Sequence, residues 1–149
     1  MTYIQGAFCM EKLLNAFIAW IVAATGMVAP PPPDVSFVSQ AQLIEMLYGD
    51  SADAKGPKVK ALYAQNIGRI YLSRDWNADD VLQRSQVLHE LVHHVQKFNK
   101  VPAPCLNAYE KQAYELQIRW LHEQGVRNPY AALDINEFTI LLLTRCSWD

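Results

Sequence analysis

The sequence has little excess of charge: 13 Lys and Arg residues nearly balance 15 Asp and Glu residues, giving a formal net charge of −2. It also lacks any run of basic residues, so nothing in it points to nucleic acid or an anionic lipid surface as a partner. Internal repeats are absent, and the only low-complexity segment is a short run of prolines. An aromatic content of 11% argues against disorder. The 149 residues therefore predict one domain with a real hydrophobic core.

The N-terminal 29 residues are dominated by an apolar stretch over residues 13–29, which follows Lys12 and precedes four prolines. A short positive start, an apolar run and small residues before a break are typical of a secretory signal peptide. We therefore predict that residues 1–29 are a signal peptide and that the protein is exported to the periplasm or secreted. An uncleaved N-terminal anchor, which would make the membrane a partner, is the alternative. A buried N-terminal helix of the domain is a third interpretation.

Cysteine is scarce as well, with three residues in the chain. Removal of the leader takes Cys9 with it and leaves Cys105 and Cys146, an even pair for an oxidising compartment. We therefore predict a disulfide that ties the start of one helix to the end of the last. Two buried thiols in a reducing cytosol are the alternative.

After the leader, the chain divides into a stiff proline-rich linker, residues 30–34, and a domain of the α+β class, residues 35–149. Residues 35–38 alternate as a short strand. Ser39 is suited to cap a helix that ends at Gly49. This order predicts a strand and a helix ahead of the rest of the domain.

The second part of the domain is predicted to hold a hairpin and three helices. A polar loop over residues 49–58 leads to two β-prone runs, residues 59–64 and 69–72, whose connector contains Asn and Gly. The three helices run from the capping residues 77–80 to about Asn99, over residues 105–124, and over about residues 132–146. The last helix carries the apolar residues Ile135, Phe138, Leu142 and Leu143.

The central motif is HExxH, here His89-Glu90-Leu91-Val92-His93. On a helix, residues four apart share a face, so His89 and His93 can hold one metal ion between their imidazoles. Glu90 lies about 100° further round, which suits a general base acting on a metal-bound water. The ligand face also carries Leu82, Gln86 and Gln96. Two apolar clusters cover the other sides, Leu88, Val92 and Val95 on one and Val87, Leu91 and Phe98 on the other.

A catalytic zinc site has three protein ligands, so a third one is expected on the following helix. At about 100° per residue, Glu110 lies about 80° from the centre of that helix's apolar stripe, whereas Glu115 lies on the opposite side. The stripe consists of Tyr109, Ala113, Leu116 and Trp120. Glu110 is therefore the predicted third ligand, and Cys105 is a weaker alternative because export favours its pairing with Cys146. His94 is about 100° from His93 and is assigned a surface or supporting role.

The segment HELVHHVQ, followed by a helix with E-x-x-A at Glu110 and Ala113, resembles the glutamate-zincins, whose third zinc ligand is a glutamate one helix downstream. Most of the chain after the prolines is similar to small exported bacterial proteins of a zincin-like family of uncharacterised function. The resemblance implies a minimal zincin-like metalloprotease fold, in which a small sheet packs on the HExxH helix beside a glutamate-bearing helix and a C-terminal helix. It also implies Zn²⁺ held by His89, His93 and Glu110, with Glu90 as the base. Tyr114 departs from the thermolysin-like pattern, which has aspartate there.

These observations predict a zinc metallopeptidase acting on peptides or proteins. By analogy with zincins, strand 69–72 is expected to pair with an extended peptide along its edge. The candidate substrate-binding residues are Ile70, Tyr71, Gln96 and Tyr114. The alternative function is a non-catalytic metal-binding or partner-binding module, because so short a chain lacks room for the second lobe of large zincins. Retention of Glu90 favours catalysis, since a structural zinc site needs no base.

Overall fold

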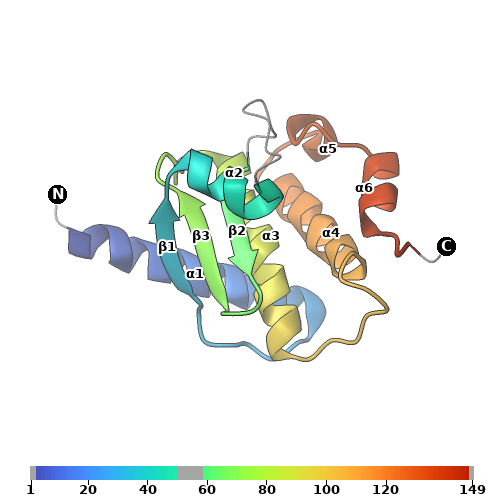
Figure 1. Cartoon of the computed structure of the whole chain (residues 1–149), viewed down its shortest axis with the longest axis horizontal. Coiled ribbons are helices and arrows are strands. Elements are labelled where there is room, and N and C mark those ends of the chain that lie inside the picture. Colours follow the sequence, from blue (N-terminus) through green and yellow to red (C-terminus); the bar gives the residue numbers. More distant parts are fainter. Residues whose placement is uncertain (1–2, 50–58, 148–149) are drawn as a thin grey trace.

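The computed structural model describes residues 3–49 and 59–147, so most of the predicted loop 49–58 lies outside the described residues. Along the chain the order of elements is α1, β1, α2, β2, β3, α3, α4, α5 and α6. A small sheet packs against α3, α4 lies along α3, and α5 and α6 follow at the far end of the molecule (Figure 1). This arrangement confirms the α+β class.

The sheet has three strands in the order β1-β3-β2, formed by Asp34–Val38, Arg69–Ser73 and Ala61–Ala64. The predicted hairpin is confirmed, because β2 and β3 pair antiparallel with Ala64 opposite Arg69. On its other side β3 pairs parallel with β1, where Asp34 lies opposite Arg69.

The central position of β3 corrects one expectation. Both of its edges are paired, and Ile70 is fully buried. The prediction that residues 69–72 offer a free edge to a peptide, with Ile70 and Tyr71 as contacts, is therefore wrong. The prediction failed because it considered the hairpin alone. After β1 the chain passes through α2 (Gln40–Tyr48) and β2, and β3 then lies beside β1. The edge strand next to α3 is β2.

The N-terminal segment forms α1 (Tyr3–Thr25), which packs against α3 and belongs to the core. Phe17 and Ile21 are 4% and 0% exposed, and the ring of Phe17 meets that of Trp120 edge to face at 5.3 Å between centroids. None of the described helices, α1 included, combines the length and apolarity needed to cross a bilayer. Removal of residues 1–29 on export stays a prediction, and it would take this side of the core away.

The residues after α1 run along α3 rather than leading away from the domain. The backbone N–H of Val28 donates to Oδ1 of Asn99 at 2.9 Å, and Nδ2 of Asn99 donates back to the Val28 carbonyl. Three residues on, the Pro31 carbonyl lies 2.8 Å from Nε2 of His94. The segment expected to be a leader exit and linker is therefore hydrogen-bonded to the HExxH helix.

The helices that bear the candidate metal ligands begin and end close to the predicted positions. In α3 (Val81–Phe98) Asp80 caps the N-terminus by accepting from the backbone N–H groups of Leu82 and Gln83. The next helix, α4 (Ala108–Glu123), begins three residues later than predicted. Leu88, Leu91, Val92 and Val95 are fully buried, whereas Phe98 is 49% exposed and does not join the cluster expected for it. Buried side chains of α1, the sheet, α3 and α4 form one core.

The C-terminal region departs most from expectation. The predicted helix over about residues 132–146 is confirmed only in part: the chain forms the short α5 (Pro129–Ala132) and then α6 (Glu137–Thr144). Asp134 adopts a positive φ of 55°, which interrupts the helical path, and Asn136 then caps α6 by accepting from the N–H of Thr139. No residue of α6 is buried. The predicted disulfide between Cys105 and Cys146 is confirmed, and Cys9 is an exposed free thiol.

Candidate metal centre

The three predicted metal ligands meet at the interface between α3 and α4. His89, His93 and Glu110 each offer a ligand atom, and these atoms lie within 4.8 Å of one another. Nε2 of His89 is 2.9 Å from Oε2 of Glu110, and Nε2 of His93 is 2.9 Å from Oε1. The histidines are 8% and 6% exposed. Of the two acidic residues that the sequence offered on α4, Glu110 meets the histidines, as its position on the helix predicted, and Glu115 is exposed.

The imidazole of His89 is oriented by a chain of hydrogen bonds from α4 back to α3. Ser85 donates its hydroxyl hydrogen to the Leu82 carbonyl, so its oxygen is left to accept from Nε2 of Gln117, 3.0 Å away. The amide oxygen of Gln117 therefore faces Nδ1 of His89 at 2.9 Å. Nδ1 carries the hydrogen in the neutral ring, and the lone pair of Nε2 points into the cluster.

His93 is oriented in the same way by a second glutamine. Nε2 of Gln96 donates to the Tyr109 carbonyl at 3.1 Å and to Oε1 of Gln112 at 2.9 Å. The oxygen of Gln96 is thereby turned to Nδ1 of His93, 3.0 Å away. When each imidazole is neutral, its hydrogen is therefore on Nδ1 and its Nε2 carries the lone pair, which is the tautomer that binds a metal.

Sequence reasoning placed Gln96 on the ligand face but missed Gln117 and Ser85. Gln117 is 4% exposed and Ser85 is fully buried. A signal for Gln117 was present, since it follows the ligand Glu110 by seven residues, or two helical turns, and so shares its face. Polar residues at that spacing on a buried helix face are candidates for supporting a ligand.

The electrostatics of the cluster call for a positive charge. Oε1 of Glu110 is close to Nε2 of His93 but is not aligned for a hydrogen bond, so that nitrogen is buried without a hydrogen-bond partner. Burial opposes a charge on His93, yet contact with Glu110 and the charge of Glu90 outweigh it and raise its pKa to about 9. Burial also opposes the charge of Glu110, but both histidines hold the pKa of this carboxyl well below its usual range. Two imidazole nitrogens and a carboxylate fit a divalent metal ion, and this donor set is not specific to zinc.

Glu90 is held beside this cluster by the edge strand. Its Oε2 accepts a hydrogen bond of 3.1 Å from the backbone N–H of Tyr63 in β2. Burial raises the pKa of Glu90, although the neighbouring histidines act in the opposite direction. A carboxyl group with a raised pKa beside a metal site is suited to take up and release a proton.

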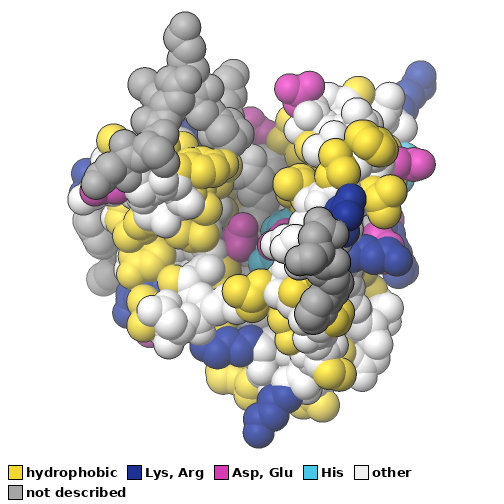
Figure 2. Space-filling model, turned by 45° about the vertical axis from the view of Figure 1, so that its right-hand side comes forward, with side chains coloured by type: hydrophobic (Ala, Val, Ile, Leu, Met, Phe, Trp, Pro, Cys, Tyr) yellow, Lys and Arg dark blue, Asp and Glu magenta, His cyan; other side chains and the backbone are white. Residues whose placement is uncertain are grey.

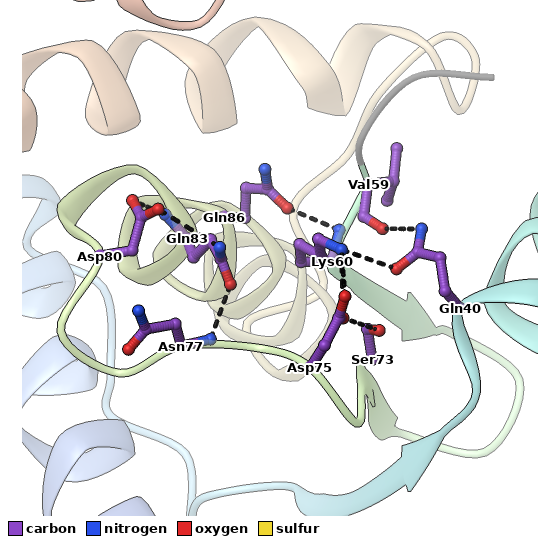
Figure 3. A network of polar contacts seen from close by, with 9 residues as sticks. All are labelled: Gln40, Val59, Lys60, Ser73, Asp75, Asn77, Asp80, Gln83 and Gln86. Carbon is purple, nitrogen blue, oxygen red and sulfur yellow. Dashed lines mark hydrogen bonds and ion pairs between the residues drawn. The ribbon is translucent and has the colours of Figure 1, made fainter. Parts of the chain in front are cut away.

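A polar network fixes the start of β2 against α3 (Figure 3). The backbone N–H of Lys60 donates to Oε1 of Gln86, one turn before Glu90, at 2.8 Å. Nζ of Lys60 reaches Asp75 at 2.9 Å and Oε1 of Gln40 at 3.1 Å, so α2 and the turn after β3 join the same network. Gln86, which the sequence placed on the ligand face, therefore positions the edge strand beside the site.

Two other predicted site residues lie close to the cluster. The ring of Tyr114 is 4.6 Å from that of His89, and burial together with the charges of Glu110 and Glu90 raises its pKa to about 12. The two nitrogens of His94 contact the hydroxyl of Tyr63 and the carbonyl of Pro31, and His94 lies outside the candidate metal cluster.

The site opens to the surface in a hollow between the sheet side and the side of α4 to α6. Figure 2 shows histidine and acidic side chains in this hollow, with Lys and Arg side chains below it. A cavity of about 230 Å³ adjoins His93 and Gln96, and Lys97, Lys100 and Tyr109 contribute to its walls.

Comparison with known proteins gives a family and no individual relative. No curated protein and no solved structure matches the chain. A family model described as "Domain of unknown function (DUF6647)" matches residues 6–149, which include most of α1. The chain belongs to this family.

Proposed function

We propose that the protein is a zinc metallopeptidase with a zincin-like active site, in which His89, His93 and Glu110 hold the metal and Glu90 is the general base. The observation that carries the proposal is the convergence of three ligand atoms within 4.8 Å. Hydrogen-bonded glutamines hold Nδ1 of both histidines, so that each Nε2 faces the carboxylate of Glu110. Glu90 supports catalysis in particular, since a purely structural site needs no base beside it.

His89, His93 and Glu110 would hold the zinc, which when bound would lower the pKa of a coordinated water and polarise a peptide carbonyl. Glu90 then accepts a proton from the attacking water and delivers it to the leaving amine. Its raised pKa favours this shuttle. The hydroxyl of Tyr114, protonated at neutral pH, is available to donate a hydrogen bond to the substrate carbonyl.

The peptide substrate is assigned to the edge of β2 in place of β3. The N–H of Ser73 donates to the Lys60 carbonyl, so residues 60, 62 and 64 turn their backbone groups toward β3. Ala61 and Tyr63 then face the open edge, where the N–H of Tyr63 already meets Glu90. A peptide that pairs along this edge lies beside the base and the metal ligands.

Export is part of the proposal and is supported by the disulfide between Cys105 and Cys146, because such bonds persist in oxidising compartments. The place of α1 in the core favours its retention in the working protein. Mass spectrometry of protein recovered outside the cytosol tests both points. Intact disulfide-bonded chains with α1 are expected, and a mature chain that begins near residue 30 would establish the signal peptide instead.

The metal and the base are tested on purified full-length protein. We expect about one zinc per chain, and loss of that zinc in His89→Ala. Glu90→Gln should keep the metal, since an amide oxygen can still accept from Tyr63 N–H, and should lose hydrolysis of a peptide mixture. Glu115→Gln, an exposed change on α4, is the matched control and should behave as wild type. Zinc binding without any hydrolysis by wild type would favour the non-catalytic module.

A further inference from the structure

We propose that the cavity beside His93 binds a carboxylate of the peptide substrate, so that the enzyme selects peptides with an acidic group close to the scissile bond. The cavity has a volume of about 230 Å³. Its walls are Gln65, His93, Gln96, Lys97, Lys100, Val101, Leu106 and Tyr109. Because His93 is both a wall of the cavity and a metal ligand, an occupant lies next to the reacting centre. This inference rests on the proposed peptidase function.

The charge of the cavity is positive. Lys97 and Lys100 lie at the end of α3 and just after it, and both are exposed. Among the described residues, no Asp or Glu contributes to the wall. Within residues 3–49 and 59–147, neither lysine forms an ion pair. Nζ of Lys97 donates to the Gln65 carbonyl, and an ammonium group has two further hydrogens to donate. An anionic group in the cavity would therefore find unused donors.

Part of the cavity wall is apolar and is held in place by a hydrogen bond. The hydroxyl of Tyr109 donates to the Val101 carbonyl at 2.6 Å, which ties the connection between α3 and α4 to the first turn of α4. Leu106, 70% exposed, lies on the same connection. The cavity is smaller than the roughly 300–1,000 Å³ clefts that hold drug-sized ligands, so it suits a single residue. A cavity lined by apolar side chains and by two lysines fits a short aliphatic chain that ends in a carboxylate.

Two sources supply this chemistry, the side chain of Asp or Glu and the free C-terminus of the peptide. The test uses zinc-loaded Glu90→Gln protein, which allows binding to be measured without turnover. One pair of fluorescent peptides differs by Glu against Gln near the centre, with amidated ends. A second pair has neutral side chains and differs by a free against an amidated C-terminus. We expect one acidic member to bind about tenfold more tightly, the scale of one charge-assisted hydrogen bond.

The variants then show whether the two lysines cause the preference. Adding Lys97→Gln and Lys100→Gln together should remove the preference for the acidic peptide and leave binding of the neutral partner unchanged. Lys111→Gln, an exposed lysine of α4 outside this cavity, is the matched control and should keep the preference. Lysines near a helix C-terminus also offset the helix dipole, so a thermal melt of each variant separates lost stability from lost binding.

The inference is overturned if both members of each pair bind alike, if nothing binds, or if the double variant weakens acidic and neutral peptides equally. Any of these results leaves zinc content and the loss of hydrolysis in Glu90→Gln as separate measurements. A wild-type protein that hydrolyses acidic and neutral peptides at the same rate would retain the proposed function and lose the cavity assignment.

Discussion

The interface of α3 with α4 and the exposed helix α6, which packs on α4, are both rich in apolar residues, yet the molecule uses them differently. At the interface Leu88, Leu91 and Ala113 are fully buried, and the polar groups among them are connected in hydrogen-bonded chains. In α6 no residue is buried, and Phe138 is 66% exposed. The comparison teaches that apolar content alone does not locate the core. In this molecule, the helix interface that is buried combines apolar residues with polar side chains that hydrogen-bond one another.

The largest effect is expected from removing a metal ligand at the interface. Glu110→Ala leaves the lone pairs of two buried histidines without their carboxylate, so we expect zinc affinity to fall by more than about 100-fold, beyond the effect of removing a supporting residue. Competition with a chelator of known affinity measures the change. Equal affinity in variant and wild type would place the metal elsewhere.

A smaller loss of affinity is expected when a supporting glutamine is changed. Gln117→Leu removes the oxygen that accepts from Nδ1 of His89 and leaves Ser85 without its donor. Changes of this kind cost about 10- to 100-fold in metal affinity, and the same chelator competition applies. The control is Gln124→Leu, at the C-terminal cap of α4. Unchanged zinc affinity in Gln117→Leu would mean that His89 is oriented by its packing alone.

The contrast in packing is tested by one substitution made in both regions. Leu91→Ala in α3 should lower the free energy of unfolding by about 2–5 kcal/mol, because it leaves a cavity in a close-packed core. Leu141→Ala in α6 removes a side chain that is 63% exposed, so it should change the free energy of unfolding by less than about 0.5 kcal/mol. Urea denaturation measures both. Similar losses in the two variants would show that α6 has a partner that covers it.

The attachment of α6 is tested by reducing the disulfide between Cys105 and Cys146. Since no residue of α6 is buried, reduction should increase amide hydrogen exchange in α6 and leave that of α3 unchanged. Zinc content should also stay the same, because neither cysteine belongs to the candidate metal cluster. Loss of zinc on reduction would connect the two regions directly.

The smallest and most gradual effect is that of pH on the metal-free protein. The pKa of His93 is about 9 in the folded chain against about 6.5 when unfolded, so its contribution to stability is complete below about pH 6.5 and is lost as pH rises through 9. Zinc must displace the same proton, so its apparent affinity should rise up to tenfold per pH unit across this range. Thermal melts with and without zinc at several pH values measure both trends. A flat profile would contradict the raised pKa.

The sequence predicted the interface of α3 with α4 better than it predicted the C-terminal region. The meeting of His89, His93 and Glu110 was predictable because they lie on buried helices, where a period of 3.6 residues fixes which side chains face each other. The cap at Ser39 and the hairpin were predictable because their signals are local. The parallel pairing of β1 with β3 was missed because it joins residues far apart in the chain. In α6 the apolar residues did not predict burial, because their pattern does not show which surface, if any, packs against them.

The N-terminal helix shows the same difficulty in another form. An apolar run such as residues 13–29 has the composition of a leader and also that of a core helix, and only packing distinguishes them. Leu14, Phe17, Ile18 and Ile21 lie in the core cluster. Gln117 was missed for a related reason, since a glutamine that supports a ligand looks like a surface glutamine until its hydrogen-bond partners are known.

The central claim is that His89, His93 and Glu110 hold zinc for catalysis, and crystallography of zinc-loaded protein with anomalous diffraction at the zinc edge tests it most directly. We predict one strong peak bonded to Nε2 of both histidines at about 2.0–2.1 Å and to a carboxylate oxygen of Glu110, with an open position facing Glu90. A peak at other residues, or a fourth protein ligand that closes the site, would contradict the account.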